Sequence, residues 1–506
     1  MVADLRPLDD LVFASGSLQA LRTALLADAP LESAAFVYAR PVRRPMGGWR
    51  LVAYDVWILA ASEYAARSAV SIELSPAVVA TAMQRARAEQ SSVILVHTHP
   101  VGGRITPSMR DLAGERVLVP ALQRRVPDVP HGRLILGRTD LDAAVFSPAA
   151  SVPPAPLVAP LVADPTGITN LAPPALESRP LRVLEIGDQV TVYDPHGPPA
   201  AFALEPDAPL EFDRQVRAFG AAGQRRLSSL RVAVVGLGGT GSVVVQQLAH
   251  LGVGSLLLID PDALERTNLN RVVGAARGDV GRSKVSIGAD AVARVNPEIV
   301  TEGLLADIRD AHVVRRLLDT DFFFGCTDSQ GSRAVLAQFA YQYSVPGIDL
   351  GVAIHAVDGQ ISHVSGRVQM LAPGLACVLC AGVLDPEAVR RDLLTDDARA
   401  ADPYIVGAAV PQPAVISLNS ATASLAVSMF LAAVTGIPLA SRHLRLRFDA
   451  GKTSSVSTTP APTCPWCSAH GYLLRGDQWM PPGRVAPPAA AAALSLAQGD
   501  AAELVR

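Results

Sequence analysis

The stretch RVAVVGLGGTG, from Arg231 to Gly241, decides the fold of the larger part of this chain. Its apolar first half is typical of a buried β-strand, and its glycines are typical of a tight turn that opens a helix. Such glycines let backbone N–H groups approach a phosphate at the positive end of the helix. The turn alone does not separate ATP-dependent enzymes from nicotinamide-dependent dehydrogenases. The glycines expected to contact a nucleotide are Gly236, Gly238, Gly239 and Gly241.

The strand that follows extends this pattern. Residues 255–260, SLLLID, read as a second buried strand ending in Asp260, whose carboxylate suits a ribose hydroxyl. From about residue 212 we therefore expect a Rossmann-like, doubly wound α/β domain with a mainly parallel sheet. Residues 10–146 also alternate strand-like runs with helix-like runs such as 76–89, which indicates a separate α/β domain before it.

A set of short motifs follows in order along the second domain. They are DRQ at 213–215, DPD at 260–262, NLNR at 268–271, Lys284, and CTD at 326–328 with Arg333 beyond. With these motifs, residues from about 213 to 470 resemble the ubiquitin-activating-enzyme superfamily, including the ThiF, MoeB and HesA adenylyltransferases. The resemblance implies that the C-terminal glycine of a ubiquitin-like protein attacks the α-phosphate of ATP. Two anions must then meet, so fixed cations and a metal are needed.

The resemblance implies a role for each matching residue. Arg271 and Lys284 would supply positive charge, and Asn268 would orient a phosphate. Asp260 would bind the ribose, and Asp328 would hold Mg²⁺, which prefers hard carboxylate oxygens. Arg214 would reach the site of a neighbouring subunit, which implies a homodimer.

Two cysteine pairs indicate a metal. Cys377 and Cys380, and Cys464 and Cys467, have the paired two-residue spacing of a closed, structural four-cysteine zinc site, and the same family has one. The fifth cysteine, Cys326, stays unassigned. The chain either stops at the acyl-adenylate, which a separate conjugating protein attacks, or passes the acyl group to a Ser or Thr; Cys326 reads more readily as a small buried residue than as a thioester nucleophile.

A second metal site is expected in the first domain. His97 and His99 follow an apolar strand, and with Asp111 they make a catalytic zinc set that leaves room for water. Together with Glu32 and Ser108, the pattern over about residues 10–146 resembles the JAB/MPN (JAMM) metalloproteases, which include deubiquitinases. The resemblance implies that Glu32 is the general base and that Ser108 donates a hydrogen bond to the oxyanion. The loop between His99 and Ser108 is one residue longer than usual.

Composition along the chain indicates the domain boundaries and the classes of partner that we expect. We expect a zinc-peptidase-like domain at 1–146, a Pro/Ala-rich linker with possible short strands at 147–211, the adenylation domain at 212–480 and a weakly ordered tail at 481–506. A net charge of -3 gives no case for nucleic acid or an anionic membrane as partner. The N-terminus shows no secretory signal, so we expect a cytoplasmic protein. The apolar stretch 421–439 is expected to be a core helix.

Together these features predict an ATP-dependent adenylyltransferase for a ubiquitin-like protein, fused to a peptidase that cuts the same kind of bond. Such fusions resemble bacterial ubiquitin-like conjugation modules, some tied to antiphage defence. Three alternatives stay open: activation of a sulfur-carrier protein for cofactor biosynthesis, a catalytically dead dimeric binding scaffold, and a nicotinamide-dependent dehydrogenase, which the cysteine pairs fit poorly.

Overall fold

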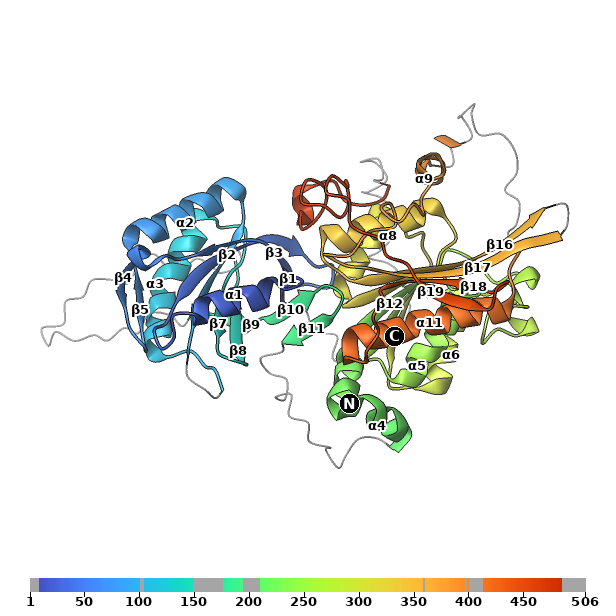
Figure 1. Cartoon of the computed structure of the whole chain (residues 1–506), viewed down its shortest axis with the longest axis horizontal. Helices are drawn as coiled ribbons and strands as arrows, with labels where there is room; N and C mark the ends of the chain where they lie inside the picture. The colour runs from blue at the N-terminus through green and yellow to red at the C-terminus, as the bar shows by residue number, and fades with distance from the viewer. Residues whose placement is uncertain are drawn as a thin grey trace, which may run out of the picture.

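The computed structural model describes residues 9–100, 104–148, 176–193, 210–357, 360–395, 398–399 and 413–484. Two α/β units lie side by side, each built on its own large sheet (Figure 1). The predicted linker segment 152–156, the turn at 194–197, most of the predicted tail and part of the loop between His99 and Ser108 lie outside these residues.

The first unit is a mixed sheet with α1 (Ser17–Leu26) on one face and α2 (Pro76–Glu89) and α3 (Met109–Arg125) on the other. α2 has the bounds that the sequence predicts, because Ser75 caps its first turn and Pro76 starts it. A small hairpin, β4 (Tyr64–Arg67) and β5 (Ile72–Leu74), lies beside the sheet. Among the described residues the strand order is β11 (Val190–Tyr193), β10 (Arg182–Ile186), β1 (Asp10–Ala14), β3 (Trp49–Ile58), β2 (Ala34–Arg43), β6 (Ser92–Thr98), β7 (His131–Leu136), β8 (Leu141–Phe146) and β9 (Ser178–Pro180).

The short strands predicted within 147–211 belong to this first sheet. β10 pairs in parallel with β1, where Asp10 lies opposite Arg182, and β9 pairs with β8. A domain boundary at residue 146 is therefore too early, because the sheet takes strands from as far along the chain as Tyr193. Pairing of β1 with β10 joins residues more than 160 positions apart, which no local pattern indicates.

The second unit has the predicted doubly wound, mainly parallel sheet. Parallel strands β14, β13, β12, β15 and β16 are followed by antiparallel β17, β18 and β19. The bounds are β12 (Arg231–Val235), β13 (Ser255–Ile259), β14 (Val300–Leu304), β15 (Phe322–Gly325), β16 (Gly347–Val357), β17 (Gln360–Leu371), β18 (His443–Arg447) and β19 (Lys452–Ser455), with helices α4 (Asp213–Ser229), α5 (Gly241–Leu251), α6 (Lys284–Val295), α7 (Ala311–Val314), α8 (Gln330–Gln342), α9 (Pro386–Leu393) and α11 (Ile416–Thr435).

Alternate side chains of β12 pack into hydrophobic cores on the two faces of the sheet. Val232 and Val234 pack into the core that α5 and α11 cover, whereas Ala233 and Val235 pack into the core that α7 and α8 cover. Figure 1 shows α8 on one side of the sheet and α5, α6 and α11 on the other. α11 is long and apolar enough to cross a membrane by length and composition, but half of that window is buried and the helix packs in the core, as predicted for this stretch.

A buried ion cluster joins the two units. The Asp10 carboxylate pairs with Arg44, with Arg50 at 3.2 Å and with Arg182 at 2.8 Å, and Arg182 also reaches Asp321 at 2.7 Å. Burial alone would raise the pKa of Asp10, but the three guanidinium groups outweigh it and hold that pKa below its usual range. Because apolar residues of both units also share these cores, the two units hold a fixed relative orientation.

Candidate functional site

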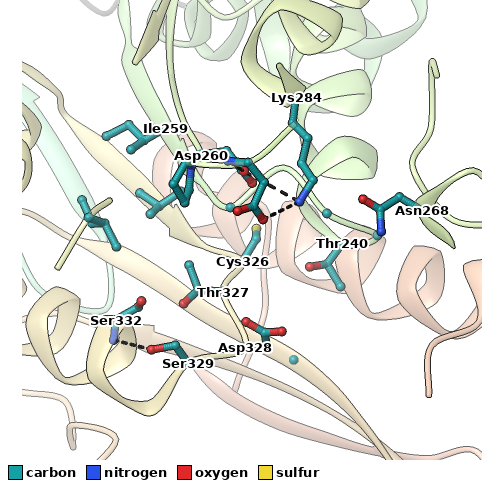
Figure 2. Close-up of a pocket in the computed structure, with 18 of the residues that line it drawn as sticks. Thr240, Ile259, Asp260, Asn268, Lys284, Cys326, Thr327, Asp328, Ser329 and Ser332 are labelled. Carbon is teal, nitrogen blue, oxygen red and sulfur yellow. Dashed lines mark hydrogen bonds and ion pairs between the residues drawn. The ribbon is translucent and has the colours of Figure 1, made fainter. Parts of the chain in front are cut away.

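A cavity of about 700 Å³ opens at the carboxyl ends of the parallel strands. Ligands of open α/β sheets bind at this edge, where the strand order reverses. Figure 2 shows Asp260, Asn268, Lys284 and Asp328 around it, contributed by four separate segments of the chain. Every residue predicted for the nucleotide site lines this cavity except Gly241 and Arg214.

The Gly-rich turn has the backbone that the motif predicts. Gly236 has φ of +87°, and a Cβ there would lie 2.9 Å from the Cys326 carbonyl oxygen. At Gly241 a Cβ would lie 1.8 Å from the Gly236 oxygen, so neither position accepts a side chain. Gly238, in contrast, faces open space within the cavity. The turn therefore presents bare backbone at the start of α5, as phosphate binding requires.

Asp260 and Lys284 form the polar centre of the cavity. One Asp260 oxygen accepts the Leu237 N–H at 2.6 Å, and the other accepts the Asp262 N–H at 2.9 Å. The Lys284 ammonium lies 3.8 Å from Asp260 and 2.7 Å from Asp262. Burial raises the pKa of Asp260, and Lys284 opposes that rise. The cation is thus positioned at the mouth of the cavity beside the expected ribose-binding carboxylate.

Of the other residues predicted for the nucleotide site, Arg271 and Asp328 line the cavity and Arg214 does not. Arg271 donates to the Thr267 carbonyl at 2.7 Å, which fixes its guanidinium on its own loop. Asp328 is exposed and makes no ion pair or hydrogen bond within the described residues, so its oxygens are open to a cation. Beside it, the buried Thr327 hydroxyl has no partner in the described part of the chain. The Arg271 guanidinium, the Thr327 hydroxyl and the Asp328 carboxylate fit the binding of ATP with Mg²⁺. Arg214 lies elsewhere, at the start of α4, with 94% of its side chain exposed.

Several cavity residues carry no signal in the local sequence. Asn419 of α11 reaches the turn, and a Cβ on Gly239 would lie 2.2 Å from its side-chain nitrogen. Asp307 and Arg309 follow β14, pair with each other and also line the cavity. Ser329 caps α8 by accepting the Ser332 N–H at 3.2 Å. Asp307 stands three residues past the end of β14, so no motif at the strand end marks it.

Cys326 is partly buried, packs under the Gly-rich turn and also lines the nucleotide cavity. Burial raises the pKa of its thiol far above the usual range. A Cβ on Gly241 would lie 3.3 Å from the Cys326 Cβ, so the side chain packs against the turn. Figure 2 shows Cys326 among the residues that line the cavity. This favours the small buried residue over the thioester nucleophile.

The four paired cysteines come together as predicted. Their sulfur atoms all lie within 4.8 Å of one another, with Cys377 at 3.5 Å from Cys464 and Cys380 at 3.6 Å from Cys467. A tetrahedral zinc site with bonds of about 2.3 Å puts its sulfurs about 3.8 Å apart. The N–H groups of Cys380 and Trp466 also point at these sulfurs, so the set fits a structural zinc.

A second cluster lies in the first unit, where the sequence predicts it. The ligand atoms of His97, His99 and Asp111 lie within 4.8 Å of one another, and each histidine Nε2 is 3.2 Å from the Asp111 carboxylate. Both ring nitrogens of His97 are buried; among the described residues Nδ1 has no hydrogen-bond partner, and Nε2 has only the Asp111 carboxylate beside it. A buried imidazole whose Nε2 meets a second histidine and a carboxylate fits a zinc ligand.

Glu32 and Ser108 flank this cluster. Glu32 is 4% exposed, lies 3.9 Å from His99, and has its pKa raised by burial while the histidines oppose the rise. Ser108 caps α3, accepting the Asp111 N–H at 3.2 Å and donating its own N–H to Asp111 at 2.6 Å. Ser108 therefore orients Asp111, and its hydroxyl hydrogen stays available to donate.

Comparison with known proteins identifies the family to which the second unit is similar. Residues 212–467, just over half of the chain, match the ThiF family. The molybdopterin-synthase adenylyltransferase of Escherichia coli is 36% identical over 155 residues, covering 30% of this chain and 61% of that protein. The SAMP-activating enzyme E1 of Haloferax volcanii is 34% identical over 169 residues, covering 33% and 58%. Ubiquitin-like modifier-activating enzyme 5 of Arabidopsis thaliana is 30% identical over 174 residues, covering 31% and 38%.

Each of these matches spans less than two thirds of the relative's length, and the family range begins after the first unit. The order of motifs that the sequence shows, the cavity they line and the matched range agree. The chain belongs to the ThiF family.

Proposed function

We propose that this protein uses ATP to adenylate the C-terminal glycine of a ubiquitin-like or sulfur-carrier protein. The observation that carries the proposal is the single cavity in which the Gly-rich turn, Asp260, Lys284, Arg271 and Asp328 meet. The match of residues 212–467 to the ThiF family removes support for a nicotinamide-dependent dehydrogenase.

The reaction joins a carboxylate oxygen to the α-phosphorus of ATP while the bond from that phosphorus to the pyrophosphate oxygen breaks. Backbone N–H groups of the turn and the side chains of Lys284 and Arg271 would stabilise the charge that develops. Mg²⁺ held by Asp328 would supply further positive charge. The protein contributes mainly position and charge, as expected for phosphoryl-group chemistry.

Transfer from the adenylate would occur without a thioester on Cys326, since its side chain packs beneath the turn and desolvation raises the pKa of its thiol far above the usual range. A separate conjugating enzyme or a sulfur donor would attack the adenylate directly. The relatives favour activation of a carrier in this broad sense, and sulfur-carrier chemistry is at least as well supported by them as protein conjugation. The proposed homodimer rests on Arg214, which is exposed and lies outside its own chain's cavity.

A second activity is favoured by the cluster in the first unit. His97, His99 and Asp111 would hold zinc, which when bound supplies a Lewis acid that activates water and polarises a carbonyl. The Glu32 carboxylate would take the proton from the attacking water, and Ser108 would keep Asp111 in place. This arrangement supports a peptidase or isopeptidase that trims or removes the same carrier, and argues against a dead scaffold.

Two assays test the proposal on the full chain. Incubation with ATP, Mg²⁺ and a small protein ending in Gly-Gly is expected to give a carrier-adenylate that mass spectrometry detects. A linear fusion that extends the carrier past its terminal glycine is expected to be cut by the wild type and not by Glu32→Gln. Absence of adenylate with every Gly-terminated carrier would overturn the first activity, and equal cutting by Glu32→Gln would overturn the second.

A further inference from the structure

Among the described residues, one face of the antiparallel strands β16, β17 and β18 lines a groove beside the nucleotide cavity. On β17, Val368 and Met370 point into the core beneath α11, so Ser365 and Arg367 lie on the opposite face. Figure 1 shows α11 along one side of these strands. A groove of about 430 Å³ lies on the other side, lined by residues of all three strands.

This groove is continuous with the nucleotide cavity. Asp328, Arg333, Gly351 and Val352 line both. Within the described residues, a chain that lies in the groove therefore leads to the place where the α-phosphate is expected. The groove's position fits the end of a polypeptide that enters the cavity.

Most of the charged side chains that line the groove are basic. Asp328 is the one carboxylate among the described residues that line it. Arg445 is exposed and makes no ion pair within the described part of the chain, and it lies opposite Arg367 in the strand register. The cationic side chains and imidazoles that line it are Arg333, Arg367, Arg445, Arg447, His355 and His363.

Carboxylates outside the lining offset this charge in part. Asp349 is buried and pairs with Arg333 at 2.9 Å and also with Arg367. Asp449 pairs with Arg447 at 2.8 Å and with His363 at 3.3 Å. Arg445 and the exposed His355 keep no acidic partner among the described residues. The outer part of the groove therefore favours negative charge on whatever lies there.

The floor of the groove is made of small residues. Ala353 of β16 pairs with Ser365 of β17, and Gly351 pairs with Arg367; a Cβ on Gly351 would meet the Arg333 guanidinium at 2.6 Å. Small residues on the floor allow an extended backbone to approach the strands closely. An extended tail with glycine at its end is a better fit than a globular surface.

We propose that this groove selects carrier proteins whose C-terminal tail carries acidic side chains a few residues before the terminal glycine. The inference rests on the proposed adenylation, since it specifies the substrate of that site. His355 lies four residues along β16 from Gly351, a rise of about 13 Å at about 3.3 Å per residue. If the terminal glycines lie beside Gly351, the acidic side chains belong roughly three to six residues from the end, next to Arg445 and His355.

The test uses the full chain and three fluorescein-labelled peptides of about ten residues ending in Gly-Gly, matched except for Glu, Gln or Lys at three positions before the glycines. Binding is measured by fluorescence anisotropy at low salt with a non-hydrolysable ATP analogue present. We expect the Glu peptide to bind about tenfold more tightly than the Gln peptide and the Lys peptide most weakly, because several charge pairs act together. Added salt is expected to remove the difference.

The matched variant is Arg445→Glu/Arg447→Glu, with Arg445→Lys/Arg447→Lys as the control that keeps the charge. The first is expected to reverse the order of the Glu and Lys peptides, and the second to keep it. Folding of both is checked by the rise in melting temperature on adding ATP. Equal binding of the Glu and Lys peptides, an unchanged order in the charge-reversed variant, or no binding of any peptide at millimolar concentration would overturn the inference.

Exchange of labelled pyrophosphate into ATP separates this inference from the adenylation itself. Exchange that is as fast with neutral or basic tails as with acidic ones would leave adenylation standing and reject the acidic preference. An acidic preference in binding, with no exchange for any Gly-terminated protein, would reject adenylation and leave the groove's charge selectivity standing.

Discussion

The ammonium group of Lys284 lies 2.7 Å from the Asp262 carboxylate, at the mouth of the nucleotide cavity. Asp262 is largely exposed, so this pair contributes little to stability and is easily exchanged for a phosphate. Lys284 is therefore held ready beside Asp260 without being tied to it.

Replacing Lys284 by Ala is expected to slow adenylation by about a hundredfold or more, the loss typical for a donor that stabilises developing charge. Asp262→Ala is the matched control and is expected to change the rate by less than about threefold, since it removes only an exposed partner. Pyrophosphate release at saturating ATP measures both. Equal losses in the two variants would mean that the pair, and not the cation, matters.

Cys326→Ala is expected to keep adenylation, because the buried thiol packs under the turn and its pKa is raised by burial. No adduct with a carrier that is sensitive to thiol reagents should form on the wild type at this residue. Non-reducing electrophoresis followed by peptide mapping checks this. A carrier adduct that maps to Cys326 and disappears in the variant would contradict the assignment.

Metal analysis of the purified chain is expected to give about two zinc ions, one for each ligand cluster. His97→Ala/His99→Ala is expected to hold about one, and Glu32→Gln about two, because Glu32 is not a predicted ligand. A value near one that the histidine substitutions leave unchanged would mean that the first unit holds no zinc as purified.

Because His131 is buried, we expect the free energy of unfolding to fall in mild acid. Its Nδ1 accepts the Val93 N–H at 3.2 Å, and burial lowers its pKa to about 4 from an ordinary 6.5. The unfolded chain therefore binds a proton between pH 6.5 and 4 that the folded chain does not, so this stability is present above pH 6.5 and declines toward pH 4. At pH 5 the loss from this residue is about 2 kcal/mol.

Urea denaturation followed by tryptophan fluorescence at pH 7.5 and pH 5 measures this effect. His131→Asn keeps an acceptor for the Val93 N–H but does not titrate, so its midpoint should fall less than that of the wild type. An equal fall in the two proteins would show that other groups account for the acid sensitivity.

Local sequence predicts the parts of this structure that local physics controls. The strand 231–235 and the helix 76–89 have the predicted bounds because an apolar run and a capped first turn define them. The two ligand clusters also follow from short sequence spacings: two residues separate the cysteines of each pair, and one residue separates His97 from His99. What the sequence cannot indicate comes from long-range packing.

Asn419 shows the limit most clearly. It enters the nucleotide cavity from α11, far along the chain from the turn that it contacts, and nothing in its neighbouring residues marks it. The same holds for β10, which joins the first sheet by pairing with β1. The basic groove is likewise visible only once β16, β17 and β18 lie in register.

The most direct test of the central claim is exchange of labelled pyrophosphate into ATP, measured on the full chain with Mg²⁺ and a Gly-terminated ubiquitin-like or sulfur-carrier protein. The account predicts exchange that needs the carrier's terminal glycine and is lost in Asp328→Asn, while ATP alone gives none. Exchange that is independent of any carrier, or that persists at the wild-type rate in Asp328→Asn, would contradict adenylation of a carrier at this site.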